Sequence, residues 1–269
     1  MRKKLWVFLN TDFPPAAWET YRGEMISSEC ISDKSFLPLS FWAVSYFRDH
    51  KDNLLNAKNE EMLELIRETY YPSQVSRLLG LYFFENETSA KKGICWGFNK
   101  KYLTEADLEY NSTTDITKVD AKWITKNITK KHNDNDWMKR YWSGQPFDND
   151  PDWELIARGK AKILDINVKN KAFLTIKKLY PYSLDLLEIS KISAKLGYEL
   201  GHSVPFIGGT QARHKIQFIM DVREINNKKF LKDFYNYVNS HSSSCKRLYE
   251  SLIKTKCRTP DFTKFSFIF

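Results

Sequence analysis

The sequence predicts an α+β fold with a basic C-terminal part, and three observations support that prediction. Of its 269 residues, 42% are hydrophobic and 15% are aromatic, which is typical of a globular chain with a substantial core. Apolar runs of strand length alternate with amphipathic segments of helical length. The formal charge is also uneven, at −3 over residues 1–155 and +12 over residues 156–269. We therefore expect an N-terminal core at 1–165 and a basic extension at 166–269.

The first strand is expected at Lys4–Asn10, where the apolar run KLWVFLN ends in polar residues. Asn10 and Thr11 offer hydrogen bonds to an amide or a ribose. A plainer role is also open, because Thr11 or Asp12 ahead of two prolines is a good N-terminus for a helix over Ala16–Tyr21.

Two segments follow whose expected role is packing. Ser35–Phe47 is rich in aromatic residues and is interpreted as core or as a lid over a cleft. Lys51–Tyr71 has apolar residues at helical spacing among Asn, Lys and Glu, which predicts an amphipathic helix.

Arg77 stands at the start of the apolar run LLGLYFFE, which predicts a buried strand. A forked, permanently charged guanidinium at the mouth of a strand suits a diphosphate. The alternative is an ion pair with Glu85 or Glu87. Alternation along the run would let Tyr82 line a cleft.

The segment WMKRYWSGQPFDNDPDWELIA joins an aromatic cluster to one acidic residue. Trp137, Tyr141 and Trp142 share a face if they lie on a helix. After a turn, a strand beginning at Trp153 would set Glu154 on one face, with its neighbours on the other. A carboxylate beside aromatic rings can hold a flat cationic ring and a sugar hydroxyl, although aromatics at this spacing are more often core.

Beyond this segment the chain is basic. The expected elements are a strand pair over residues 160–180 joined near 167–171, a helix within 183–200, a glycine turn at 208–209 and a strand over 214–222. Lys228–Lys256 has basic and aromatic residues at helical spacing, which could stack bases and track phosphates or be ordinary surface and core. The charge itself favours a polyanion, an acidic inhibitor protein or simply a solvated lysine-rich surface.

Residues 63–164 contain a set of motifs found together in one group of proteins: Ser76-Arg77 before a strand, the aromatic strand and acidic segment YFFENETSA, the Tyr-Trp-Ser-Gly element from Tyr141, and Trp153-Glu154. On these motifs the chain resembles a bacterial family related to ADP-ribosyltransferases. It departs from the wider group in two places. Phe8-Leu9-Asn10-Thr11 replaces a Tyr-His-x-Thr opening, and Asp152-Trp153-Glu154 replaces Glu-x-Glu.

The resemblance implies a core of two small antiparallel sheets around a cleft for NAD, which would be the co-substrate. Glu154 would be the catalytic carboxylate, Arg77 would hold the diphosphate and Asp152 would position the acceptor. The remaining implied contacts with NAD are Asn10, Thr11, Tyr82, Trp137, Tyr141 and Trp142. No metal is called for.

In size and basic balance the chain is similar to the mRNA-modifying ADP-ribosyltransferase toxins of phage-defence systems, which implies RNA as acceptor and a protein antitoxin and a SecB-like chaperone as partners. A protein acceptor and a non-catalytic nucleic-acid-binding module are the alternatives. No apolar run approaches the roughly 20 residues of a membrane span, so we expect no membrane association and a cytoplasmic location.

Overall fold

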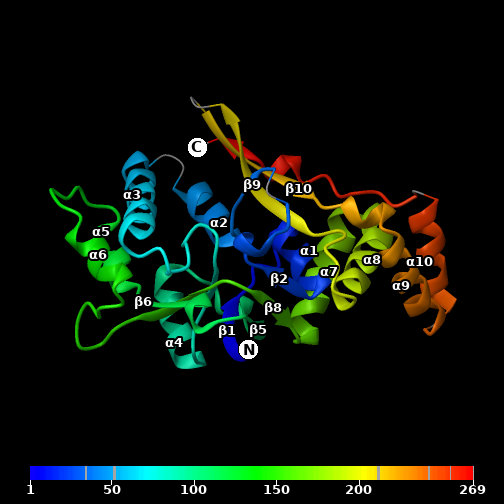
Figure 1. The fold of residues 1–269 in the computed structure, drawn as a ribbon, viewed down its shortest axis with the longest axis horizontal. Coiled ribbons are helices and arrows are strands. Elements are labelled where there is room, and N and C mark those ends of the chain that lie inside the picture. Colours follow the sequence, from blue (N-terminus) through cyan, green and yellow to red (C-terminus); the bar gives the residue numbers. More distant parts are fainter. Residues whose placement is uncertain (34, 51–52, 211–212, 242, 255, 269) are drawn as a thin grey trace.

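Three small antiparallel sheets and the helices around them form the part of the chain that the computed structural model describes, residues 1–33, 35–50, 53–210, 213–241, 243–254 and 256–268 (Figure 1). The predicted α+β class is confirmed, with three sheets. Their strand orders are β1-β5-β8-β2, β11-β10-β9-β3 and β4-β7-β6.

The strands are β1 (Arg2–Phe8), β2 (Glu24–Ile26), β3 (Leu37–Pro38), β4 (Leu81–Phe83), β5 (Leu103–Glu109), β6 (Ile116–Asp120), β7 (Trp153–Ala157), β8 (Lys160–Ile163), β9 (Ser203–Thr210), β10 (Arg213–Met220) and β11 (Phe267–Ile268). The helices are α1 (Pro14–Arg22), α2 (Phe41–Asp49), α3 (Leu54–Tyr70), α4 (Glu87–Lys92), α5 (Lys122–Asn127), α6 (Asp136–Trp142), α7 (Ile166–Leu179), α8 (Leu184–Lys195), α9 (Lys228–Asn239) and α10 (Ser243–Ile253).

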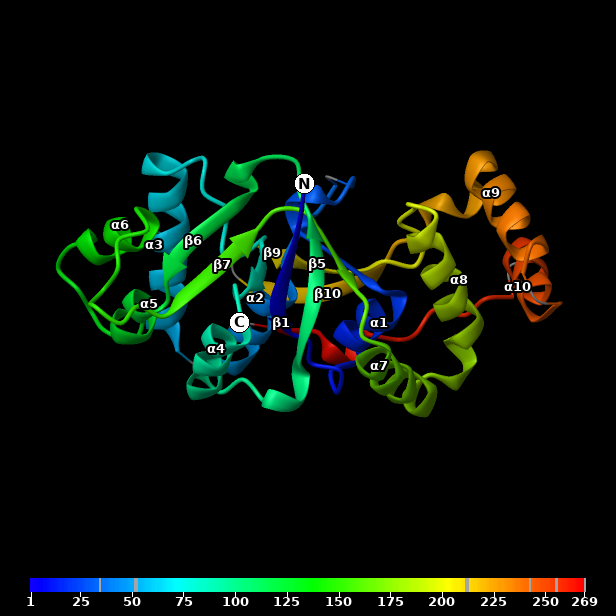
Figure 2. The same ribbon diagram turned by 90° about the horizontal axis from the view of Figure 1, so that it is seen from below.

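Strands β7 and β8 connect two of the sheets, because the chain leaves the β4-β7-β6 sheet and enters the β1-β5-β8-β2 sheet within a few residues (Figure 2). Gly159, with φ of 151°, makes the passage possible. A Cβ there would lie 2.3 Å from the carbonyl oxygen of Glu109, so the two backbones approach too closely for any side chain.

Alternation along β7 confirms the predicted strand and its two faces. Leu155 and Ala157 pack in the core between β1, β5 and β8, whereas Ile156 packs with α3, α5 and α6. Glu154 therefore faces the same side as Ile156. The pairing of β4 with β7 ends at Phe83 opposite Leu155, so Glu154 lies one residue beyond that pairing.

Helices α3, α5 and α6 form one end of the molecule (Figure 1). The predicted helices at 51–71 and around Trp137–Trp142 are confirmed as α3 and α6, although residues 51–52 lie outside the described part. Trp137, Tyr141 and Trp142 are at most 5% exposed and pack against Leu63.

Residues 160–180 are not the predicted strand pair, because only β8 is a strand and α7 follows it. The Asp165 side chain accepts hydrogen bonds from the backbone N–H groups of Asn167 and Val168, which is an N-cap. The buried positions Val168, Ala172 and Ile176 then recur at helical spacing.

The other expected elements are confirmed in part. The helices within 183–200 and 228–256 and the strand over 214–222 are confirmed as α8, α9, α10 and β10. The glycine turn is wrong, since Gly208 and Gly209 lie within β9. The N-cap of α1 is Phe13, without a side-chain cap bond, so capping by Thr11 or Asp12 is also wrong.

The basic extension is joined to the N-terminal part by pairing and by buried polar contacts. β3, at residues 37–38, pairs with β9. On α1, Glu19 is fully buried, lies 2.7 Å from His202 Nδ1 and accepts a 2.6 Å hydrogen bond from the Ser203 backbone N–H. The boundary near residue 165 thus separates elements that share a sheet and a core.

Candidate functional site

An inner cavity of about 470 Å³ lies between β1, α2 and β4 and reaches Glu154 at the start of β7. We use the name inner cavity for this space throughout. Its wall is mostly aromatic and aliphatic, with a few polar groups. The residues that matter for its chemistry are Asn10, Trp42, Tyr46, Arg77, Tyr82 and Glu154.

Arg77 is the centre of the polar network in this wall. Its side chain is 3% exposed, and Nη2 donates a 2.9 Å hydrogen bond to Glu60 Oε1, while Nε lies 3.1 Å from both Glu60 oxygens. Nη1 donates to the Tyr141 hydroxyl at 2.6 Å and to Glu154 Oε1 at 3.2 Å. Most of the guanidinium N–H groups are therefore used inside the protein.

Glu154 accepts hydrogen bonds from two donors and still lines the cavity. It is 7% exposed, and its Oε1 accepts from Arg77 and, at 2.9 Å, from the Tyr141 hydroxyl. Within the described residues Oε2 accepts no hydrogen bond. Burial raises the pKa of the Glu154 carboxyl above its ordinary value, although Arg77 and the Tyr141 hydrogen bond oppose the shift.

Aromatic rings form a continuous stack along one side of the cavity. Trp42 stacks on Tyr82 at 4.5 Å between centroids and on Tyr46 at 5.1 Å, and Tyr46 stacks on His50 at 4.6 Å. The Arg77 guanidinium lies 4.6 Å from the Trp42 ring centroid. Because neighbouring rings in this stack cover one another's faces, a flat ligand entering the cavity would meet mainly ring edges here.

When both carboxyls are ionised, the network carries one excess negative charge. Within the described residues, the two carboxylates of Glu60 and Glu154 pair with one cation, Arg77. Burial opposes the charge of Arg77, yet the surrounding groups, Glu60 first, raise its pKa well above its ordinary value. One excess negative charge then lies beside stacked rings. Such a site favours a cationic ligand or a protonated Glu154.

A comparison with known families gives one match. The model of a family described as a protein of unknown function (DUF2441) matches residues 34–170, which is half of the chain. The chain belongs to the DUF2441 family. No curated protein matches it. Glu60, Arg77, Tyr141 and Glu154 all lie within the segment that the DUF2441 model matches.

Four of the predicted site residues line the inner cavity: Asn10, Arg77, Tyr82 and Glu154. Arg77 does so in a different role from the one expected, since its donors are used by two carboxylates and a phenol. An added diphosphate would face those carboxylates at close range. The predicted diphosphate contact at Arg77 stays a prediction, with most of the donors of this guanidinium already used. The alternative pairing with Glu85 or Glu87 is wrong, because both of those residues pair with lysines.

The other predicted site residues lie elsewhere. Trp137 and Trp142 belong to the core under α3, and the wall as described includes neither of them. Tyr141 is fully buried and reaches the site only through its hydroxyl. Asp152 pairs with Lys92 at 3.0 Å, and Thr11 is 4% exposed; neither side chain is in the described wall.

Sequence reasoning missed Trp42, Tyr46 and Glu60. The first two had a signal, because Trp42, Tyr46 and His50 follow one another at a spacing of four. Glu60 had one as well, since it stands three residues before Leu63 on the apolar face of α3. A carboxylate on an apolar helix face implies a buried cation as its partner.

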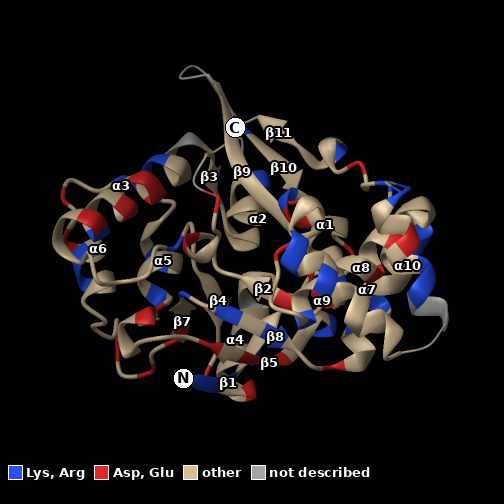
Figure 3. Ribbon diagram, turned by 45° about the vertical axis from the view of Figure 1, so that its right-hand side comes forward, with Lys and Arg blue, Asp and Glu red and all other residues tan. Residues whose placement is uncertain are grey.

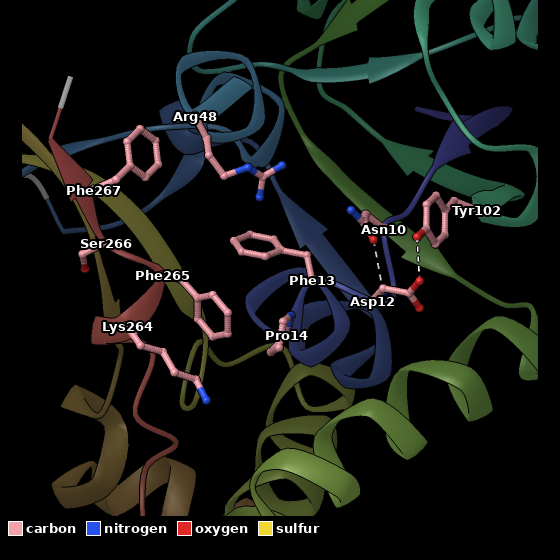
Figure 4. A pocket seen from close by; sticks show the side chains of 10 residues that line it. All are labelled: Asn10, Asp12, Phe13, Pro14, Arg48, Tyr102, Lys264, Phe265, Ser266 and Phe267. Carbon is pink, nitrogen blue, oxygen red and sulfur yellow. Dashed lines mark hydrogen bonds between the residues drawn. The ribbon is translucent and has the colours of Figure 1, made fainter. Parts of the chain in front are cut away.

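An outer pocket of about 430 Å³ adjoins the inner cavity (Figure 4). The two share four lining residues, Asn10, Phe13, Arg48 and Tyr102. The far wall of the outer pocket is the C-terminal segment Lys264–Phe267. The Arg48 guanidinium extends toward the middle of this pocket, above the Phe13 ring.

The described residues contain no group of three or more His, Cys, Asp and Glu side chains that could hold a metal ion. No helix among them is long and apolar enough to cross a bilayer.

Proposed function

We propose that this DUF2441 protein is an NAD-dependent ADP-ribosyltransferase with Glu154 as the catalytic carboxylate. The single observation that supports this most is the Glu154 carboxylate itself. It is fixed through Oε1 by Arg77 and Tyr141, and within the described residues nothing hydrogen-bonds to Oε2, which is at the wall of an aromatic cavity. The resemblance of residues 63–164 to ADP-ribosyltransferases points to the same residue.

The charge and shape of the inner cavity suit the nicotinamide end of NAD. Nicotinamide in NAD is a flat ring with a positive charge, which the one excess negative charge of the network would attract, and the Tyr82–Trp42–Tyr46 stack supplies an aromatic wall beside it. The ribose next to that ring carries hydroxyls that can donate to Oε2 of Glu154. Asn10, also in the wall, can bond to a carboxamide.

The reaction breaks the bond between the ribose C1′ and nicotinamide, forms a bond from C1′ to the acceptor, and releases nicotinamide and a proton. Positive charge develops on the ribose as the first bond breaks, much as in glycoside hydrolysis. An ionised Glu154 beside the ribose would stabilise that charge and accept the proton from the acceptor. Its raised pKa makes it a better base than an exposed carboxylate.

Arg77 has a positioning role in this proposal. Its guanidinium is clamped by Glu60 at 2.9 Å and in turn holds Oε1 of Glu154, so the carboxylate has one orientation. Tyr141 acts together with Arg77, because its hydroxyl lies 2.9 Å from Oε1 and 2.6 Å from Arg77 Nη1. Such preorganisation keeps the second oxygen directed at the substrate.

RNA is the proposed acceptor, within a toxin–antitoxin or phage-defence system. The +12 formal charge of residues 156–269 supports it, because lysines that neutralise phosphates supply affinity that does not depend on sequence. Figure 3 shows Lys and Arg on α7, α9 and α10, whereas α3 at the other end carries several acidic segments. A toxin of this kind would have a protein antitoxin and a SecB-like chaperone as partners.

Two aromatic residues of the C-terminal helices are not available to RNA bases. Phe230 and Phe234, which their spacing left open as stacking platforms, are fully buried in the core between α8, α9 and α10. Any base contact must therefore come from other rings.

The test is an incubation of the protein with labelled NAD and a cell extract that is then fractionated. We expect the label in RNA, its removal by ribonuclease and its absence with Glu154→Gln. Glu85→Gln, a surface change on the same half, is the control and should label normally. Label that survives ribonuclease but not protease would select a protein acceptor. No label and no released nicotinamide would leave a non-catalytic nucleic-acid-binding module.

A further inference from the structure

The outer pocket has a charge opposite to that of the inner cavity. Asp12 is neutralised by Lys101 at 2.6 Å, and Arg48 pairs with Asp49 at 3.0 Å. Lys264 is exposed and has no ion pair within the described part of the chain, and its ammonium lies 4.9 Å from the Tyr180 ring centroid. One positive charge is therefore left over at this pocket, and it attracts an anion.

Aromatic rings stand next to that charge. Phe265 packs edge-on against Phe13 at 5.4 Å, and the Lys264 ammonium lies 5.4 Å from the Phe265 centroid. Tyr102 closes the opposite side, where its hydroxyl donates a 2.8 Å hydrogen bond to Asp12 (Figure 4). A flat ring and a phosphate are the two features that a nucleotide presents, and this pocket offers a partner for each.

We propose that the outer pocket binds one nucleotide of a single-stranded RNA acceptor, with its base against Phe265 and its phosphate beside Lys264. The inference rests on the proposed function and names the place where the acceptor enters. The shared residues Asn10, Phe13, Arg48 and Tyr102 connect this nucleotide to the space in front of Glu154.

Two observations favour an acceptor nucleotide over the adenosine half of NAD. The wall at Lys264–Phe267 lies outside the 34–170 segment that defines the family, whereas the Glu154 network lies wholly within it. The same wall also belongs to residues 156–269, whose formal charge is +12, and an RNA strand with phosphates on either side of the bound nucleotide gains more from that charge than a single dinucleotide does.

The C-terminal segment is held firmly enough to form such a wall. A 3₁₀ turn over Thr263–Phe265 precedes β11, which pairs with β10 through Ile216 opposite Phe267. Phe262 beneath it is 5% exposed and packs against Tyr180 and Trp18. Lys264 extends from this frame into solvent, so its substitution should leave the fold intact.

The experiment measures RNA labelling by wild-type, Lys264→Glu, Phe265→Leu and Lys229→Glu proteins, with RNA and NAD varied in turn. The probe is a short single-stranded RNA of mixed sequence. Lys229→Glu is the matched control, because it makes the same charge change on α9, away from the pocket. We expect Lys264→Glu to raise the KM for RNA about tenfold and Phe265→Leu several-fold, with the KM for NAD unchanged.

Two outcomes would overturn the proposal. A raised KM for NAD with an unchanged KM for RNA would assign the pocket to the adenosine half of NAD. Equal increases in the KM for RNA in Lys264→Glu and Lys229→Glu would show that Lys264 contributes only general surface charge and that the outer pocket binds no nucleotide. If the wild-type protein releases no nicotinamide, the transferase proposal fails by itself. Fluorescence anisotropy with the same RNA then still decides whether Lys264→Glu weakens binding more than Lys229→Glu.

Discussion

Arg77 Nη1 lies 3.2 Å from Oε1 of Glu154, and both side chains are less than 10% exposed. The pair is therefore a buried one, whose energy depends on the groups around it rather than on water. Glu60 supplies the second anion and Tyr141 the second donor to Oε1. This arrangement leads to predictions for stability, for pH and for ligand binding.

Arg77→Met should destabilise the protein by about 3 to 5 kcal/mol, because it leaves the carboxylates of Glu60 and Glu154 buried without a cation. Urea unfolding followed by tryptophan fluorescence measures the change. Lys91→Met is the control, since its ion pair with Glu87 is about half exposed and should change the free energy of unfolding by less than about 1 kcal/mol. Similar losses for the two variants would contradict the account of the network.

Tyr141→Phe should raise the pKa of Glu154 further, because it removes a hydrogen bond that favours the ionised carboxylate. If Glu154 must be ionised for catalysis, the acid limb of the pH–rate profile moves to higher pH in this variant. Tyr235→Phe, on an exposed face of α9, should leave the profile unchanged. An unchanged pH–rate profile in Tyr141→Phe would show that the Tyr141 hydroxyl does not influence the pKa on which the activity depends.

Glu154→Gln should become more stable relative to wild type as the pH rises. The pKa of Glu154 is raised in the folded state, so the folded protein binds this proton more tightly than the unfolded chain does. The stability that the protonated carboxyl contributes is complete below the unfolded pKa of about 4.3 and is lost as the pH rises through the folded pKa. Urea unfolding of both proteins across that range tests the sign, and a difference independent of pH would contradict it.

Trp42→Leu should raise the KM for NAD about tenfold, because it removes the ring at the centre of the Tyr82–Trp42–Tyr46 stack. Trp137→Phe is the matched control. Trp137 is buried in the core and is not in the described wall of the inner cavity, so the KM for NAD should stay as in the wild type. Initial-rate kinetics at varied NAD concentration measure both, and a larger effect of Trp137→Phe would restore the stacking role predicted for it.

The local sequence predicted α6, β7 and the face of Glu154, because each depends on spacing within a few residues. It misplaced the partners of Arg77, since Glu60 comes from α3 and Tyr141 from α6 and only the folded chain brings them together. The predicted strand pair at residues 160–180 is wrong for another reason. The apolar residues Leu164, Ile166 and Val168 alternate with polar ones as in a strand, but the Asp165 N-cap starts a helix there.

The length of the strand after Arg77 was also predicted wrongly. LLGLYFFE reads as one strand, yet β4 covers only Leu81–Phe83. Gly80 explains the shortening, because residues 76–80 form a turn with a 2.9 Å bond from the Gly80 N–H to the Ser76 carbonyl. A Cβ at Gly80 would lie 2.4 Å from Ile156, so close packing against β7 requires glycine there.

The most direct test of the central claim is the amount of nicotinamide that the purified protein releases from NAD in the presence of RNA. The account predicts release by the wild-type protein in step with the transfer of ADP-ribose to RNA. It also predicts a loss of at least about a hundredfold in Glu154→Gln, with circular dichroism as the check that this variant is folded. Equal release by the wild type and by Glu154→Gln, or none by either, would contradict it.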